Sequence, residues 1–216
     1  MSGKKKIEII LIGGGGHCKS VIDVITSNDI FQIIGILDLR EKVGSELLGF
    51  PIIGTDEDLP QLIKKYSNFH ISLGHIFSNT SRIKLFNSIK ELGGNLPVIS
   101  ANDAHISVYA TIGEGVFIGH KVVINAGAHI GINTIINTGA IIEHDTVIGK
   151  HCHISTLAAV NADCIIRDSC FLSSQVVVNR GIELADKAVV YSGSVITKSF
   201  KKEGISLKGI PAKIII

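Results

Sequence analysis

The sequence predicts two regions of different fold class: an α/β region over residues 1–100 and an all-β parallel solenoid over residues 101–216. Three observations lead to this prediction. Strand-like and helix-like segments alternate in the first region, and aliphatic residues recur at every sixth position in the second. The chain also contains 23 glycines and only 5% aromatic residues. Such a composition is typical of repeated short strands.

Short apolar runs and helix-like segments alternate in the first region. Strands are expected at Ile7–Ile12, Phe31–Leu37 and Phe69–Leu73, and helices at Lys19–Thr26, Pro60–Tyr66 and Ser78–Leu92. This order favours a parallel sheet covered by helices, that is, a small Rossmann-like domain.

A run of four glycines, Gly13–Gly16, joins the first strand to the first helix and is followed by His17. In this context, backbone N–H groups and the start of the helix can bind phosphate. The dinucleotide fingerprint is incomplete, because Cys18 stands where its third glycine belongs. Two interpretations therefore stay open: a phosphate-binding loop, or a tight turn that binds nothing.

The second region has a period of six residues. From Ile106 to Ile196, all sixteen positions in this phase hold Ile, Val or Leu. After the first fifteen of them, the position four residues further on is small or β-branched. A large and a small inward-facing residue on each segment predict a three-sided prism, in which each hexapeptide forms one face and three faces form one coil. Residues 200–216 are expected to cap its end.

Three of the four cysteines, Cys152, Cys164 and Cys170, fall at the small inward position, which predicts core residues rather than nucleophiles. No segment resembles a secretory signal or a membrane span, and Lys4–Lys6 is expected to be a solvated end. These features predict a cytoplasmic protein with free thiols and no membrane partner. The net charge of +2 argues against a nucleic-acid partner.

The outward-facing segment Glu143-His144-Asp145 places a histidine between two carboxylates. Histidine is the usual general base near neutral pH, and an adjacent carboxylate can orient its ring and raise its basicity. The alternative is a solvated surface histidine without a catalytic role.

The repeat and this segment resemble the sugar acyltransferases of the hexapeptide superfamily, whose fold is a left-handed β-helix. The chain is most similar to a bacterial group that places a Rossmann-like domain before the β-helix. This group contains UDP-4-amino-sugar N-acetyltransferases, perosamine N-acetyltransferases and sialic acid O-acetyltransferases. The resemblance rests on the loop 13–17, the stretches 137–138 and 143–145, His153 and the terminal segment 209–213.

The resemblance implies roles for four residues of the solenoid. His144 corresponds to the catalytic base, and Asp145 corresponds to the acidic residue, usually the longer Glu, that orients it. Asn137 corresponds to a residue that contacts the sugar. His153 corresponds to a histidine that contacts the pantetheine part of coenzyme A near the thioester.

In the first region, the resemblance implies that Gly15, Gly16 and His17 contact the diphosphate of a nucleotide sugar. Asp38, at the end of the second strand, is expected near the uridine. The implied acceptor is the 4-amino group of a UDP-linked amino-deoxy sugar; the alternative acceptor is a hydroxyl group of sialic acid or a related nonulosonic acid.

The implied reaction uses acetyl-CoA as co-substrate, no metal, and direct attack of the acceptor on the thioester. The implied assembly is a homotrimer with the active site between subunits. This agrees with the outward-facing apolar residues Val123, Ile135, Ile141 and Val147, which need cover.

Two other function classes fit the solenoid less well. Zinc-dependent carbonic anhydrases with this fold have two histidine ligands five residues apart, and no two histidines of the repeat have that spacing. A trimerisation scaffold without catalytic activity would not require the segment Glu143-His144-Asp145.

Overall fold

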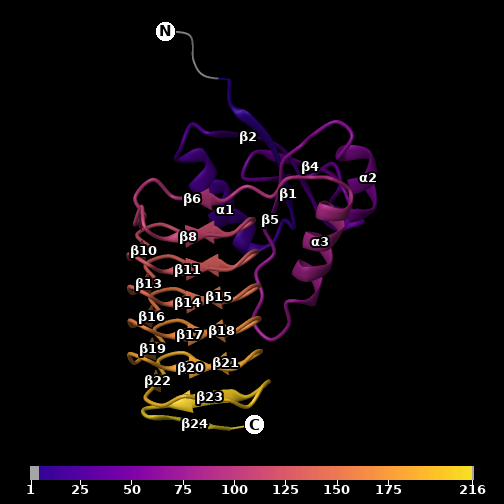
Figure 1. The fold of residues 1–216 in the computed structure, drawn as a ribbon. Coiled ribbons are helices and arrows are strands. Elements are labelled where there is room, and N and C mark those ends of the chain that lie inside the picture. The colour runs from indigo at the N-terminus through magenta and orange to yellow at the C-terminus, as the bar shows by residue number, and fades with distance from the viewer. Residues whose placement is uncertain (1–4, 216) are drawn as a thin grey trace.

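The computed structural model describes residues 5–215; Lys4 of the N-terminal lysine run lies outside them. The α/β domain lies at the upper end of a long prism, and α3 descends along the side of its upper coils (Figure 1). The described part of the chain contains no helix that is long and apolar enough to cross a membrane.

The α/β domain is built around a five-stranded sheet with the order β3-β4-β2-β1-β5. Its strands are parallel except for the β3–β4 pair. The strands are β1 (Ile7–Ile12), β2 (Phe31–Leu37), β3 (Glu46–Leu47), β4 (Phe50–Gly54) and β5 (Phe69–Ile71). The α-helices are α1 (Gly16–Thr26), α2 (Leu59–Leu62) and α3 (Thr80–Glu91), and short 3-10 helices span Arg40–Lys42 and Asp56–Asp58.

The three predicted strands and three predicted helices are therefore confirmed, although α2 is shorter than expected. The pair β3 and β4 was not predicted. These strands lie in residues 46–54, where a two-residue strand and a Pro-containing edge strand leave little periodicity to detect.

The prism consists of three parallel sheets, which we call its first, second and third faces. The first face contains β7 (His105–Ile106), β10 (Val123–Ile124), β13 (Ile141–Ile142), β16 (Ala159–Val160), β19 (Val177–Val178) and β22 (Val195–Ile196). The second contains β8 (Thr111–Ile112), β11 (His129–Ile130), β14 (Val147–Ile148), β17 (Ile165–Ile166) and β20 (Glu183–Leu184).

The third face contains β6 (Ile99–Ser100), β9 (Phe117–Ile118), β12 (Ile135–Ile136), β15 (His153–Ile154), β18 (Phe171–Leu172), β21 (Val189–Val190) and the terminal hairpin β23 (Ser206–Gly209) and β24 (Ala212–Ile214). The fold is the left-handed β-helix that the repeat and the resemblance predict. Each of the sixteen predicted hexapeptides forms one strand, from β7 to β22.

Residues 18 positions apart lie directly above one another in the prism. Ile124, Ile142 and Val160 are paired in this way on the first face, and all three are fully buried. Cys152, Cys164 and Cys170 are also fully buried in this core, as predicted. The stacking turns the six-residue pattern into one continuous hydrophobic column that no single coil could form alone.

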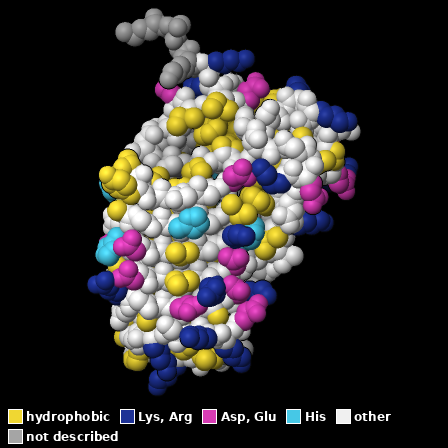
Figure 2. All heavy atoms as spheres, in the orientation of Figure 1, with side chains coloured by type: hydrophobic (Ala, Val, Ile, Leu, Met, Phe, Trp, Pro, Cys, Tyr) yellow, Lys and Arg dark blue, Asp and Glu magenta, His cyan; other side chains and the backbone are white. Residues whose placement is uncertain are grey.

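The coil starts one hexapeptide earlier than predicted, at β6, which pairs with β9. Ser100 occupies the position that holds an aliphatic residue in all later segments, so the pattern does not reveal this strand. At the other end, Phe200, Ile205, Leu207 and Ala212 close the core beneath the last coil. Lys and Arg side chains gather around this lower end, near β23 and β24 (Figure 2).

The α/β domain covers the upper part of the third face. Phe117 and Ile135 belong to the same buried cluster as Ile9 of β1 and Val21 of α1. Ile135 is therefore fully buried within a single chain. The sequence predicts cover by a neighbouring subunit, which is wrong for Ile135. Sequence patterning cannot tell which partner covers an apolar face. Val123, Ile141 and Val147, on the other two faces, stay partly exposed.

Candidate active site

His144 lies at the corner where the first face meets the second, in the turn between β13 and β14. Its Nδ1 lies 2.8 Å from Oδ2 of Asp145, and the two side chains are 49% and 62% exposed. No hydrogen bond to Nε2 occurs within the described residues. An imidazole held through Nδ1 by a carboxylate, with Nε2 open to solvent, can accept a proton from a bound substrate.

The stacking of the coils shapes the surroundings of His144. The positions one coil before and one coil after it hold Ala126 and Ala162, so the ring has no bulky neighbour in its own column. Gly127 lies one coil before Asp145 and has a φ of +74°. A Cβ atom on Gly127 would come within 2.4 Å of Oδ1 of Asp145. This glycine therefore makes room for the carboxylate that orients His144.

Further polar side chains border this corner. Asn125 Nδ2 donates a hydrogen bond of 2.9 Å to Glu143. An oxygen of Asp163, one coil after Asp145, lies within 4.8 Å of both a His144 ring nitrogen and an Asp145 oxygen. Sequence reasoning missed Asp163, although its position 18 residues after Asp145 would have revealed it.

Asn137 and His153 lie elsewhere on the prism. Asn137 follows β12 at the corner between the third and first faces, where its Oδ1 accepts a hydrogen bond from the Thr138 amide. His153 begins β15 on the third face. Within a single chain, Asn137 and His153 thus lie apart from His144. Their expected contacts with the sugar and the coenzyme stay predictions.

His153 is buried beneath a loop of the α/β domain. Its Nδ1–H donates a hydrogen bond of 2.8 Å to the backbone carbonyl of His75, and its ring packs between those of His75 and Phe171. Burial lowers the pKa of His153 to about 4. The imidazole is therefore neutral near pH 7, and its Nε2 can only accept a hydrogen bond.

The glycine loop opens toward solvent at Gly15 and Gly16. Gly15 is the N-cap of α1 and has no side-chain hydrogen bond to cap the helix. A Cβ atom on either Gly15 or Gly16 would meet nothing within 4 Å, whereas one on Gly14 would clash with Asp38 Oδ2 at 2.6 Å. The first amides of α1 are consequently free to bind an anion.

Asp38 lies beside this loop and lines a cavity of about 680 Å³ at the carboxyl ends of β1 and β2. Its Oδ1 accepts a hydrogen bond from the Leu39 amide, and its Oδ2 pairs with Lys42 at 2.7 Å. Asp56 lines the same cavity, and burial, followed by the charge of Asp38, raises its pKa. The cavity is adjacent to the loop, as a nucleotide site requires.

The side chain of His17 does not lie on the open side of the loop. Its ring packs edge-on against Phe117, with centroids 4.9 Å apart, and burial lowers its pKa well below the ordinary value. Of this residue, the backbone amide in the first turn of α1 is the group that remains for the predicted contact with phosphate. Glycine-loop patterns do not indicate which way the following side chain turns.

Arg82, on α3, joins the α/β domain to the prism. It is fully buried, and its guanidinium donates to the carbonyl oxygens of Ile71 (2.7 Å) and Leu73 (2.6 Å) and to Oδ1 of Asn133 (2.7 Å). Burial lowers its pKa to about 9. An arginine at a helix position gives no sequence signal for such burial.

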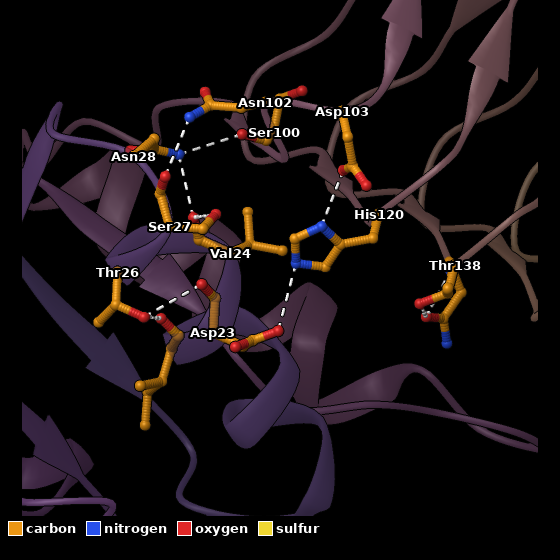
Figure 3. A network of polar contacts seen from close by, with 12 residues as sticks. Asp23, Val24, Thr26, Ser27, Asn28, Ser100, Asn102, Asp103, His120 and Thr138 are labelled. Atoms are coloured by element: carbon orange, nitrogen blue, oxygen red, sulfur yellow. Dashed lines mark hydrogen bonds and ion pairs between the residues drawn. The ribbon is translucent and has the colours of Figure 1, made fainter.

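A second contact between the domain and the prism lies on α1. His120, in the turn after β9, places Nδ1 2.8 Å from Asp103 and Nε2 3.2 Å from Asp23 of α1 (Figure 3). Nearby, Asn28 Nδ2 donates to the Ser100 carbonyl at 3.2 Å. These contacts fix the helix that carries the glycine loop against the first coils.

Comparisons with known proteins cover both regions. Residues 8–89 match the family model of the PglD N-terminal domain. The structure of PerB from Caulobacter crescentus in complex with CoA and GDP-perosamine is 30% identical, with 96% of each chain covered and a TM-score of 0.88. The sequence matches no curated protein significantly.

Two further solved structures share the architecture. The acetyltransferase domain of PglB from Neisseria gonorrhoeae, in complex with acetyl coenzyme A, is 26% identical over 98% of this chain and 100% of that one, with a TM-score of 0.90. WeeI from Acinetobacter baumannii AYE is 22% identical over 96% and 100% of the two chains, with a TM-score of 0.84, which supports the fold alone.

Proposed function

We infer the function of this chain from its family, because it belongs to the hexapeptide-repeat sugar acetyltransferases that carry a PglD-type N-terminal domain. It is an acetyl-CoA-dependent enzyme that acetylates the amino group of a nucleotide-linked sugar. The more specific acceptor that we propose is the 4-amino group of a UDP-linked amino-deoxy sugar. The observation that supports this chemistry best is the exposed His144, held by Asp145 with Nε2 free.

In the proposed mechanism, His144 acts as the general base. The neutral amine attacks the thioester carbonyl carbon while Nε2 of His144 takes the proton that the nitrogen loses. The tetrahedral intermediate then collapses, the C–S bond breaks, and coenzyme A leaves as the thiol once it regains a proton. Asp145 orients the imidazole and stabilises its protonated form. A positioned base of this kind contributes about 10²–10⁴-fold to the rate.

The α/β domain would hold the nucleotide. The free amides at Gly15, Gly16 and His17 suit the diphosphate, and the cavity beside Asp38 suits the nucleoside. PerB was crystallised with a GDP-sugar, so the uridine preference needs a direct comparison of both nucleotides.

We propose that three chains assemble around the active site. Asn137, His144 and His153 lie at separate corners and faces of one prism, so neighbouring chains are needed to bring them together. Exposed apolar side chains occur on the uncovered faces and corners, which is typical of an interface; they include Val108, Tyr109, Ile141, Val147 and Ile165. Light scattering should give three times the mass of the chain, whereas a monomer would contradict the proposed assembly.

A cytoplasmic location is also proposed. All four cysteines are free and buried, which suits a reducing compartment.

O-acetylation of sialic acid is the alternative. The corner around His144 carries Glu143, Asp145 and Asp163, so the carboxylate of a sialic acid would meet like charge there. An amino sugar, which is largely protonated near neutral pH, would meet opposite charge. This difference favours the amine.

The test is a thiol-release assay with acetyl-CoA and a panel of acceptors: UDP- and GDP-linked 4-amino sugars, and sialic acid. Turnover with a UDP-4-amino sugar supports the full proposal. Turnover with only the GDP-linked sugar would contradict the uridine assignment, and turnover with only sialic acid would contradict amine acetylation.

A further inference from the structure

Asp163 is held in a fixed position next to the proposed base. It lies in the same column as Asp145, one coil further on, and its backbone amide donates a hydrogen bond of 3.2 Å to the carbonyl of His144. Its φ of +59° places it in the left-handed region, as does the φ of +58° at Asp145. The two aspartates therefore present their carboxylates from equivalent places on successive coils.

Arg180 binds only one of the two oxygens of this carboxylate. Its Nε and Nη2 lie 2.7 Å and 2.6 Å from Oδ2 of Asp163. Oδ1 accepts no hydrogen bond from any residue that the structure describes. The pair limits the rotation of the Asp163 carboxylate, while Oδ1 stays available to a ligand.

The column that contains His144 keeps this space open. Arg180 lies two coils after His144, and the position between them is Ala162. Next to Asp163 in its own column, Gly181 has open space around the place of a Cβ atom. An oxygen of Asp163 lies within 4.8 Å of a ring nitrogen of His144, so a small cationic group can approach both the imidazole and the carboxylate.

We propose that the free oxygen of Asp163 binds the protonated amino group of the acceptor next to His144, and so selects amino sugars over hydroxyl sugars. The proposal rests on the proposed function, because it requires the acceptor to reach this corner. Binding of the ammonium by Asp163 precedes the chemical step. This ammonium proton is first lost to solvent through His144, which returns to its neutral form. The neutral amine then attacks, and the imidazolium that His144 forms on taking the next proton lies between the carboxylates of Asp145 and Asp163.

The experiment measures dissociation constants for a pair of ligands, a nucleotide-linked 4-amino sugar and its 4-hydroxyl counterpart, in the presence of CoA. We expect the wild type to prefer the amino sugar. In Asp163→Asn, the amino sugar should bind about tenfold more weakly, while binding of the hydroxyl sugar should change less than about twofold. Asparagine has the same shape as aspartate and tolerates the left-handed backbone, so the fold should be retained.

The dependence on pH gives a second readout. The wild-type preference should decline as the pH rises through the pKa of the substrate amine, because the ammonium form is lost, and Asp163→Asn should show no such decline. A matched control is Glu183→Gln, which breaks a similar carboxylate–arginine pair, with Arg167, two coils from the His144 turn. The control should keep the wild-type preference.

Equal weakening of both ligands in Asp163→Asn, or an unchanged preference, would overturn the inference. A wild type that releases no thiol with any amino sugar would instead contradict the proposed function. A wild type that acetylates amino sugars, together with an Asn variant that keeps the preference, would contradict the role of Asp163 alone.

Discussion

The two regions of the molecule place their functional residues in different ways. In the α/β domain, Gly13 and Asp38 come from separate loops that meet at the carboxyl edge of a sheet. In the prism, the neighbours of His144 and Asp145 are the residues 18 positions away, which are set by stacking. The site in the domain thus depends on loop conformation, whereas the site on the prism depends on which residue occupies each column.

The seam between the two regions differs from both. It encloses four histidines, His17, His70, His75 and His153, around the buried Arg82, whereas His144 stands in solvent. Burial thus keeps the histidines of the seam neutral, whereas the side chain of His144 is about half exposed to solvent. The following predictions test this division of roles, from the largest expected effect to the smallest.

Acid should destabilise the seam. Burial lowers the pKa of His70 and of His75 to about 3 and that of His153 to about 4, and it lowers the pKa of His17 well below its ordinary value. The unfolded chain therefore binds more protons below pH 6.5, and the stability present above that pH is lost as the pH falls toward 4. Four such groups correspond to about 5 kcal/mol per pH unit.

Thermal unfolding measured between pH 7.5 and 4.5 checks this prediction. A melting temperature that does not depend on pH in this range would show that the four histidines of the seam are not held in their neutral form. His144→Asn should show the same acid sensitivity as the wild type, because residue 144 lies outside the seam.

His144→Asn should lower kcat by about 10²–10⁴-fold, because the variant lacks the general base. The melting temperature and the binding of the nucleotide sugar should change little, since the side chain is half exposed. The matched control is His105→Asn, which removes another exposed histidine from the first face. If His144→Asn keeps wild-type turnover, the proposed mechanism is wrong.

Gly15→Ala should raise KM for the nucleotide sugar by about tenfold, because the methyl group would hinder the approach of the diphosphate to the amides. The backbone of Gly15 is extended, with φ −86°, and the space around its Cβ position is open. Stability should therefore be retained, and kcat should stay within about threefold. Steady-state kinetics measure the effect, and Ser20→Ala, at an exposed position on the same helix, is the control. An unchanged KM would show that the loop is a turn that binds no ligand.

The smallest effect is expected for alkylation of the cysteines, which should not react in the native protein. Burial raises the pKa of Cys18 to about 11 and that of Cys152 well above its ordinary value, and all four thiols are buried. Reactive thiols are ionised and accessible, so iodoacetamide should not modify the native protein and should modify four sites after unfolding. Intact-mass measurement distinguishes the two states, and labelling of native Cys152 would contradict its place in the core.

The sequence predicts the prism more completely than the seam, for a physical reason. Each hexapeptide contributes its own aliphatic residue to the core, so the pattern is local. Every segment of the prism shows it except the first, where Ser100 occupies the aliphatic position. The seam depends on contacts between segments far apart in the chain, such as Arg82 with Asn133 and His153 with His75. No local periodicity reports such contacts.

Within the candidate sites, the adjacency of His144 and Asp145 in the sequence predicts that their side chains pair. In the structure, Nδ1 of His144 lies 2.8 Å from Oδ2 of Asp145. The side-chain direction of His17 and the cover over His153 did not follow, because each depends on where the α/β domain packs on the third face. Asp163 lies between these cases, since its place beside His144 can be worked out once the 18-residue spacing is known.

That spacing also restricts how chains of this kind can change in length. Insertion of 18 residues into the prism would add one full coil and leave every downstream corner in its original direction. Insertion of six would rotate all that follows by one third of a turn, so that the closing hairpin, which pairs with β21, would end beneath a different side from the one that carries the α/β domain. Gains and losses of whole coils are therefore the length changes that preserve the geometry of the molecule.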